Sequence, residues 1–158
     1  MPGLKYAKYI VTEDLARKPP AGFLKRREEQ RRSGNYLEAT HMLSLNNTIA
    51  QGALYCDTVW LWNKKGAKGV ETEIAHSHDF DEILGFMGSR RENPKELNAE
   101  IEFWLGDEKY LITQSCLIFA PRNIAHCPLI FHRIDTPVLF FTVGNGISYS
   151  RATGSEEQ

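Results

Sequence analysis

Three side chains between residues 76 and 82 are of the kinds that bind metal ions: His76, His78 and Glu82. Side chains two residues apart in a β-strand point to the same face, so the two histidines are predicted to lie side by side. Glu82 follows them after a short Asp-Phe-Asp turn. Imidazoles and a carboxylate form a mixed nitrogen and oxygen ligand set that suits a divalent transition metal. The alternative is that both histidines lie on the solvent face of a strand.

The parity of neighbouring apolar residues orients these candidate ligands. Ile74 has the same parity as His76 and His78, so this face of the strand is predicted to point inward. Glu82 shares its face with Leu84 in the next predicted strand. Side chains on inward faces can converge with side chains from other strands. The pattern therefore favours a buried site.

The overall composition is that of a globular domain. The chain has 158 residues, of which 42% are hydrophobic and 25% are charged, and this suits a single domain with one core. A formal net charge of −1 gives no general attraction to nucleic acid or to an anionic membrane. The sequence contains no apolar run of about 18 residues that would cross a bilayer, and its start lacks the apolar stretch of a secretory signal. We expect a cytoplasmic protein.

The three cysteines, Cys56, Cys116 and Cys127, are widely spaced and lie in apolar runs. Their odd number and the lack of a C-x-x-C pair argue against a disulfide framework and against a zinc ribbon. We expect reduced, buried thiols. Cys127 follows His126 directly and is predicted to point to the opposite face of its strand, so we exclude it as a metal ligand.

The first 50 residues differ in pattern from the rest of the chain. Residues 22–32 are rich in helix formers and in basic side chains, and they end at a Ser-Gly-Asn turn. This predicted helix is either a basic surface for an acidic partner or, as we favour, a solvated helix whose acidic residues balance the basic ones. We predict an N-terminal arm and helix over 1–50, a β domain over 51–146 and a flexible tail over 147–158.

The β domain is predicted from runs of β-branched and aromatic residues that end at Gly, Pro, Asn or Asp. These runs cover residues 54–62, 70–78, 82–87, 99–105, 109–113, 116–120, 124–133 and 137–143. The run 116–120 is apolar throughout, which favours a strand that is covered on both faces. Short strands in this number predict an all-β sandwich or barrel.

Alternation in the run 124–133 places four residues on one face: His126, Pro128, Ile130 and His132. Proline has no N–H group to donate to the neighbouring strand, so Pro128 predicts a bulge or an edge position. Asn123, just before this run, lies in a predicted turn, and asparagine tolerates the left-handed conformation that such turns need.

Together these residues resemble the two sequence motifs of the cupin superfamily. The first motif consists of a glycine, H-x-H, a glutamate and a second glycine, and it matches Gly69, His76, His78, Glu82 and Gly88, with each outer glycine displaced by one position. The second motif matches at Pro121 and His126. Ser115 and Asn123 replace its two glycines, and Ile130 replaces its final asparagine. The resemblance covers residues 55–143.

The resemblance implies an antiparallel β-barrel of the jelly-roll type with a metal bound by His76, His78, Glu82 and His126. Three imidazoles and one carboxylate would leave two positions of an octahedral ion open, as in a catalytic site, whereas structural zinc sites are closed. The cofactor would be one divalent transition metal, and the ligand set does not choose among Fe, Mn, Ni, Co and Zn.

Three functions fit such a site. The first is a metal-dependent enzyme of the isomerase, epimerase, lyase or decarboxylase type, whose small polar, oxygen-rich substrate chelates the metal. The second is an Fe(II)-dependent dioxygenase. The third is a non-catalytic cupin that binds a small molecule. Four polar ligands in a core argue against a purely structural barrel, and we favour the first function.

Five aromatic residues are candidates for lining the substrate pocket, with plain core packing as the alternative for each. They are Tyr55, Trp60, Trp62, Phe86 and Phe119. An anionic substrate could also contact Arg122, although an arginine in a turn is more often a surface residue. We also expect small cupins to pair, so the N-terminal 50 residues are a candidate contact of a homodimer.

For the other polar residues near the motifs we favour structural or surface roles. Asp79 and Asp81 could accept a hydrogen bond from a ligating histidine, but we favour exposed carboxylates that form a turn. His41 and His132 have no evident partner in the sequence and are predicted to be structural or exposed.

Overall fold

The structure is a computed structural model that describes residues 3–15 and 19–146. Within these residues the helical elements are the 3₁₀ turn η1 (Ala7–Tyr9) and the helix α1 (Ala21–Arg32). The strands are β1 (Leu37–Leu45), β2 (Tyr55–Lys64), β3 (Val70–Glu73), β4 (Glu82–Gly88), β5 (Glu96–Leu105), β6 (Glu108–Gln114), β7 (Cys116–Ala120), β8 (His126–Ile134) and β9 (Val138–Gly144).

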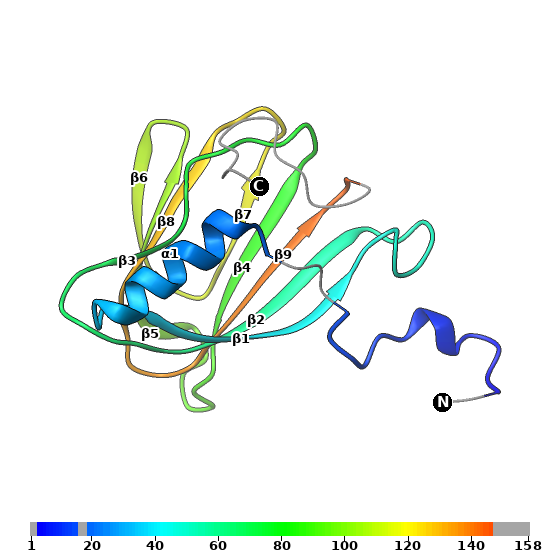
Figure 1. Cartoon of the computed structure of the whole chain (residues 1–158), viewed down its shortest axis with the longest axis horizontal. Coiled ribbons are helices and arrows are strands. Elements are labelled where there is room, and N and C mark those ends of the chain that lie inside the picture. The colour runs from blue at the N-terminus through cyan, green and yellow to red at the C-terminus, as the bar shows by residue number, and fades with distance from the viewer. Residues whose placement is uncertain (1–2, 16–18, 147–158) are drawn as a thin grey trace.

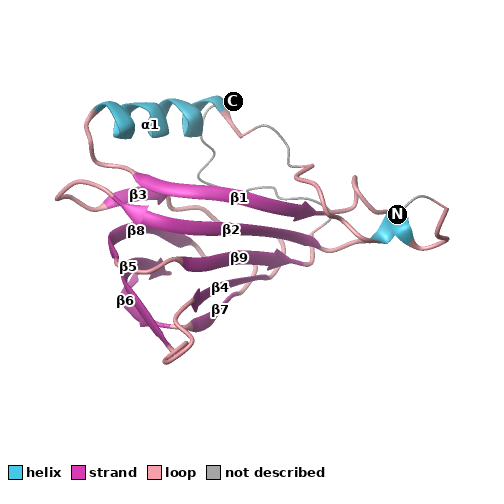
Figure 2. Cartoon of the chain, turned by 90° about the horizontal axis from the view of Figure 1, so that it is seen from below, coloured by secondary structure: helices cyan, strands magenta, loops and turns pink. Residues whose placement is uncertain are grey.

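The strands form two antiparallel sheets that face each other (Figures 1 and 2). The larger sheet has the order β1-β2-β9-β4-β7, and the smaller sheet has the order β3-β8-β5-β6. The chain crosses between the sheets after β2, β3, β4, β6, β7 and β8, so neighbours within a sheet are mostly distant in sequence. The predicted all-β jelly roll with a short N-terminal helical segment is confirmed.

The core lies between the inner faces of the two sheets. Leu84 and Phe86 of the larger sheet and Ile101 and Phe103 of the smaller sheet are all buried in it. Glu82 has the parity of Leu84 and is buried as well, as the sequence predicted. The alternation of strand side chains therefore carries one candidate ligand into the interior.

The first histidine pair does not lie on a regular strand, which corrects the strand predicted over 70–78. Strand β3 ends at Glu73, and His76 forms only an isolated antiparallel bridge with His126. His76 and His78 nevertheless both point inward, since each is buried. The bridge, rather than a long strand, fixes their position.

The prediction that strand 116–120 is covered on both faces is wrong. Strand β7 is the edge strand of the larger sheet. Its Cys116, Ile118 and Ala120 face the core, while Leu117 and Phe119 are 64% and 58% exposed. An apolar residue at every position is compatible with burial of both faces of a strand, but it does not require it.

Strand β8 contains the irregularity that Pro128 predicted. Its pairing with β5 shifts register near this residue, and Cys127 has a φ of +67°. The shift breaks the alternation of side chains along the strand. The prediction that His126, Ile130 and His132 share one face is therefore wrong. His126 is buried, whereas Ile130 and His132 are only partly buried.

The first 50 residues contribute a strand to the larger sheet. Strand β1 pairs with β2 along its length, so the sheet begins before the boundary that we predicted at residue 51. Helix α1 packs beside β3, where Arg26 donates to the carbonyl oxygen of Thr72 and Gln30 donates to that of Glu71. The predicted tail over 147–158 lies outside the described residues.

Among the described residues, neither helix is long and apolar enough to cross a membrane. No disulfide joins Cys56, Cys116 and Cys127, and only Cys127 has the full burial that we expected of all three. Partial burial raises the pKa of the Cys56 and Cys116 thiols. The cytoplasmic location stays a prediction.

Candidate metal centre

Backbone carbonyl groups orient two of the candidate ligand rings. The Nδ1 atom of His76 lies 2.7 Å from the carbonyl oxygen of Ile74, and the Nδ1 atom of His126 lies 3.3 Å from that of Ile124. A carbonyl oxygen can only accept a hydrogen bond, so each Nδ1 carries the proton in these contacts. Nε2 is then the ring atom that would bind a metal in both histidines.

The three histidines converge in the interior at one end of the sandwich. Their nearest ligand atoms all lie within 4.8 Å of one another. The ring centroids are 4.5 Å apart for His76 and His126, 4.8 Å for His76 and His78, and 5.1 Å for His78 and His126. All three side chains are at most 3% exposed. This cluster could hold a metal ion.

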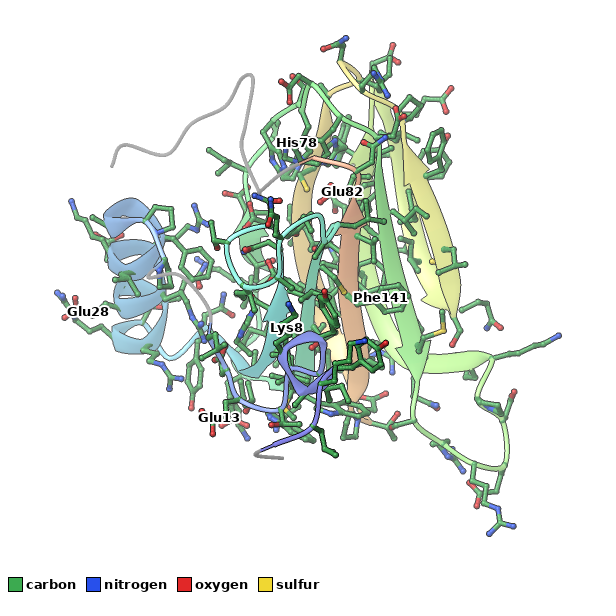
Figure 3. All side chains as sticks on the ribbon, turned by 90° about the vertical axis from the view of Figure 1, so that its right-hand side faces the viewer. Lys8, Glu13, Glu28, His78, Glu82 and Phe141 are labelled. Carbon is green, nitrogen blue, oxygen red and sulfur yellow. The ribbon has the colours of Figure 1, made fainter. Side chains whose placement is uncertain are left out.

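Glu82 lies beside two of these rings. Its Oε2 atom is 3.1 Å from Nε2 of His126 and 3.4 Å from Nε2 of His78, and Figure 3 shows Glu82 and His78 at the same end of the strands. Burial raises the pKa of Glu82, but hydrogen bonding and charge interactions with the two imidazoles outweigh burial and lower it to about 2. The carboxylate is therefore ionised at neutral pH and has the charge of a metal ligand.

Backbone contacts join the two motif segments. His76 and His126 exchange both backbone hydrogen bonds, at 3.0 and 2.8 Å. The N–H group of Asn123 donates to the carbonyl oxygen of His78 at 2.7 Å, and Asn123 adopts a φ of +65°. The predicted left-handed turn is thus present, and it places the second motif against the first.

An exposed ion pair forms a further link between the motif segments. Arg122 donates to Asp81 from its guanidinium group at 2.8 Å and from its backbone N–H at 2.9 Å. The hydrogen bonds from Arg122 lower the pKa of Asp81 to about 2. Asp79 is exposed, as we favoured. The sequence did not predict this pairing, because the two residues lie 41 positions apart.

Comparison with solved structures finds similar chains of low sequence identity. A cupin protein from Bacteroides fragilis is 16% identical at a TM-score of 0.45, over 75% of this chain and 82% of that chain. A predicted oxalate decarboxylase from Thermotoga maritima is 16% identical at 0.44, over 71% and 84%. A DMSP lyase is 13% identical at 0.41, over 66% of this chain and 45% of the lyase chain. A scan against family models and a search of curated proteins find no match.

At these identities and scores the likenesses carry no information on substrate or reaction. The structure itself decides the fold. Two antiparallel sheets of the jelly-roll type carry both histidine motifs and bring their three histidines together. The chain has the cupin fold. The resemblance found in the sequence is confirmed at this level.

One aromatic residue beside the candidate metal centre was missed in the sequence. Phe80 stacks on the ring of His78, with centroids 4.5 Å apart and planes at 11°. Its ring also occupies the space where a Cβ atom on Gly144 would lie, so the glycine is needed for this close approach. A lone aromatic residue between two aspartates was the available signal, because such a side chain in a polar turn needs an apolar contact.

The predicted pocket residues divide into two groups. Tyr55 is buried, its ring centroid lies 6.4 Å from that of Phe80, and its hydroxyl group is hydrogen-bonded to Thr142. Phe86 is also buried, but it stacks on Phe140 in the core. Tyr55 is thus near the cluster, whereas Phe86 is a core residue, which is the alternative that we considered for each aromatic residue.

The other three predicted pocket residues do not reach the cluster. Trp60 and Trp62 have the parity opposite to the buried Leu61 and stack on each other at 5.4 Å on the outer face of the larger sheet. Phe119 is exposed on the same outer face. The prediction that these residues line the pocket is wrong.

The two remaining histidines have partners that the sequence did not suggest. His41 lies between two carboxylates, with Nδ1 3.0 Å from Asp14 and Nε2 3.3 Å from Asp57. His132 lies 3.0 Å from a carboxylate oxygen of Glu102 on the outer face of the smaller sheet. Neither histidine contributes to the buried cluster.

Proposed function

We propose that this cupin domain is a metal-dependent enzyme whose small, oxygen-rich substrate chelates the metal. The observation that carries the proposal is the convergence of three buried imidazoles beside an ionised glutamate. Burial of polar groups is unfavourable unless they are satisfied. A bound cation would contact all four groups at once.

We propose one divalent transition metal, from among Fe, Mn, Ni, Co and Zn, with His76, His78, His126 and Glu82 as its ligands. The donor set fits such an ion, because imidazole nitrogen and carboxylate oxygen both bind metals of this group. When bound, the metal would act as a Lewis acid toward a substrate carbonyl, hydroxyl or carboxylate oxygen.

The surrounding residues of the chain would fix and shield this site. The hydrogen bonds from Nδ1 of His76 and His126 to backbone carbonyl groups hold the rings in orientation. Phe80 packs flat against His78, and Tyr55 lies behind Phe80. These aromatic rings exclude water from one side of the cluster, which strengthens electrostatic interactions there.

The reaction types that fit are isomerisation or epimerisation, lyase chemistry and decarboxylation. We would incubate the Mn(II)- and Zn(II)-loaded protein under argon with small hydroxy acids, keto acids and sugar acids, and follow each by proton NMR. We expect oxygen-independent conversion of at least one acid, and its loss in His126→Ala.

The same experiment separates the alternatives. Turnover that requires both oxygen and Fe(II) would support the dioxygenase instead. Line broadening of an acid by the Mn(II) protein, without conversion under any condition, would support the non-catalytic binding protein. Failure of the parent protein to bind any of the five metals would contradict both metal-dependent enzymes.

A further inference from the structure

Positive charge is concentrated around helix α1 and the turn that joins β2 to β3. Segments 25–36 and 63–69 together contain eight basic and two acidic residues, a formal charge of +6. The remainder of the chain contains 11 basic and 18 acidic residues, a formal charge of −7. The eight basic residues are Lys25, Arg26, Arg27, Arg31, Arg32, Lys64, Lys65 and Lys68. We call these eight residues the basic surface.

Hydrogen bonds fix the turn beside the end of α1. Tyr36 and Lys65 exchange both backbone hydrogen bonds, at 3.2 and 2.8 Å. The side chain of Asn35 accepts from the backbone N–H group of Lys68 and donates to the carbonyl oxygen of Gly69. Figures 1 and 2 show the loop between β2 and β3 beside the end of α1 that leads into β1. The two basic segments therefore lie next to each other in the fold.

The charges of α1 are balanced on one side of the helix only. Glu28 forms an ion pair with Arg32 at 2.7 Å. Arg27 and Arg31 lie one helical turn apart, and neither has a carboxylate partner among the described residues. Like charges at this spacing destabilise a helix. Burial lowers the pKa of Arg27, and the charge of Arg31 lowers it further. An anion between the two guanidinium groups would remove this unfavourable interaction.

Aromatic rings hold these two arginines in place. The guanidinium carbon of Arg27 lies 5.6 Å from the ring centroid of Phe23, and that of Arg31 lies 5.0 Å from the ring centroid of Tyr36. A guanidinium group that lies over a ring can still present its N–H groups to a carboxylate. Side chains that are already ordered lose less conformational entropy on binding. The arginine pair is thus prepared for an anion.

We propose that the basic surface binds a short acidic segment of a partner protein. In an extended segment, residues two apart share a face and are about 6.7 Å apart. Arg27 and Arg31 are separated by about 6 Å along the helix axis, so each guanidinium group can meet one carboxylate of such a segment. The lysines of the turn continue the positive charge beyond the end of the helix. Charge complementarity would select this partner.

Nucleic acid suits this surface less well. Proteins that bind single strands offer aromatic faces on which bases stack, but guanidinium groups cover the rings of Phe23 and Tyr36. Helix α1 has 12 residues and is therefore about 18 Å long. The negative charge of the remaining chain would repel a polyanion that extends beyond the basic surface. An acidic segment of about six residues spans the helix without leaving this surface.

The test measures binding of a fluorescein-labelled decapeptide of alternating Glu and Ser to the full chain, by fluorescence anisotropy at low salt. The test variant carries Arg27→Gln and Arg31→Gln. The matched control carries Arg90→Gln and Arg91→Gln, because this pair is exposed in the loop between β4 and β5 and its loss changes the net charge equally. Far-ultraviolet circular dichroism and thermal unfolding verify that both variants are folded.

The parent and the control variant should bind the peptide, and added salt should weaken the binding, because the charges are exposed. The dissociation constant should increase at least tenfold in the Arg27→Gln, Arg31→Gln variant. A parent that does not bind the peptide at 200 μM protein would overturn the proposal, as would equal affinity in the test variant. Tighter binding of single-stranded oligothymidine, or of phosphatidylserine vesicles, than of the peptide would overturn it in favour of nucleic acid or a membrane.

Discussion

Two clusters of histidine and carboxylate side chains in this protein use their imidazole rings in different ways. In the buried cluster, backbone carbonyl groups accept from Nδ1 of His76 and His126, so the Nε2 atoms remain directed at a common space. In the second cluster, His41 has a carboxylate at each ring nitrogen, Asp14 on one side and Asp57 on the other.

The difference shows what distinguishes a metal site from a structural cluster of the same residue types. Ligating imidazoles must each direct one nitrogen to a point that the other ligands share. His41 instead directs its two ring nitrogens at separate carboxylates, and its contact with Asp14 fastens the N-terminal segment to strand β1. The buried cluster has three histidines that can each turn one nitrogen to the same point. We therefore expect substitutions in the buried cluster to weaken metal binding and substitutions in the second cluster to leave it unchanged.

The largest expected effect is the increase in thermal stability that a bound metal gives the parent protein. A ligand that binds only the folded state at 100 times its dissociation constant stabilises it by about 2.7 kcal/mol. Excess Zn(II) or Mn(II) should therefore raise the midpoint of thermal unfolding of the parent and of His41→Ala by several degrees. In His76→Ala the midpoint should not move. A comparable increase in His76→Ala, seen by calorimetry, would break the distinction between the clusters.

The next effect concerns the fourth ligand. Glu82→Gln retains the size of the side chain but removes its charge, and it should weaken metal binding at least tenfold, or about 1.4 kcal/mol. Asp57→Asn makes the same change in the second cluster and should leave the affinity unchanged. Competition titration with a chromophoric chelator measures both. Equal affinity in Glu82→Gln and in the parent would remove Glu82 from the ligand set.

A smaller effect is expected from the exposed link between the motif segments. Arg122→Gln leaves Asp81 without its guanidinium partner, so the two segments should be held less firmly. We expect metal to bind only a few-fold more weakly, because exposed ion pairs contribute little and are screened by salt. Asp81→Asn should have a similar effect, and the double variant should be no worse than either single one. Additive losses would show that the two residues act separately.

The smallest effect on the metal site should come from His41→Gln. This change removes one carboxylate contact of the N-terminal segment and leaves the buried cluster untouched. Metal affinity should stay within twofold of the parent, while limited proteolysis should cleave before β1 more rapidly. A loss of metal in this variant would mean that the two clusters are coupled.

Sequence reasoning identified the candidate ligands from residue types and their spacing. His76 and His78 were predicted to face the interior from the parity of Ile74, and His126 was added through the resemblance to the cupin motifs. The structure brings all three together. Glu82 was placed correctly because Leu84, on the same face of its strand, is buried. Local rules sufficed for His76, His78 and Glu82, since strand parity and turn chemistry act over a few residues.

Long-range features could not be predicted in the same way. Alternation along β2 separates Trp60 from Leu61, but both are apolar, so the pattern does not show which of them faces the core. The exposed edge position of β7 depends on the order of strands in the sheet. The Asp81–Arg122 pair likewise depends on two loops meeting in space. Each of these features is set by topology, which the sequence of one chain does not display.

The most direct test of the central claim is the metal content of the purified parent, His126→Ala and His41→Ala, measured by elemental analysis after dialysis against a metal-free buffer. We predict close to one transition-metal ion per chain in the parent and in His41→Ala, and loss of most of it in His126→Ala. Full occupancy in His126→Ala, or equal loss in His41→Ala, would contradict the site described here.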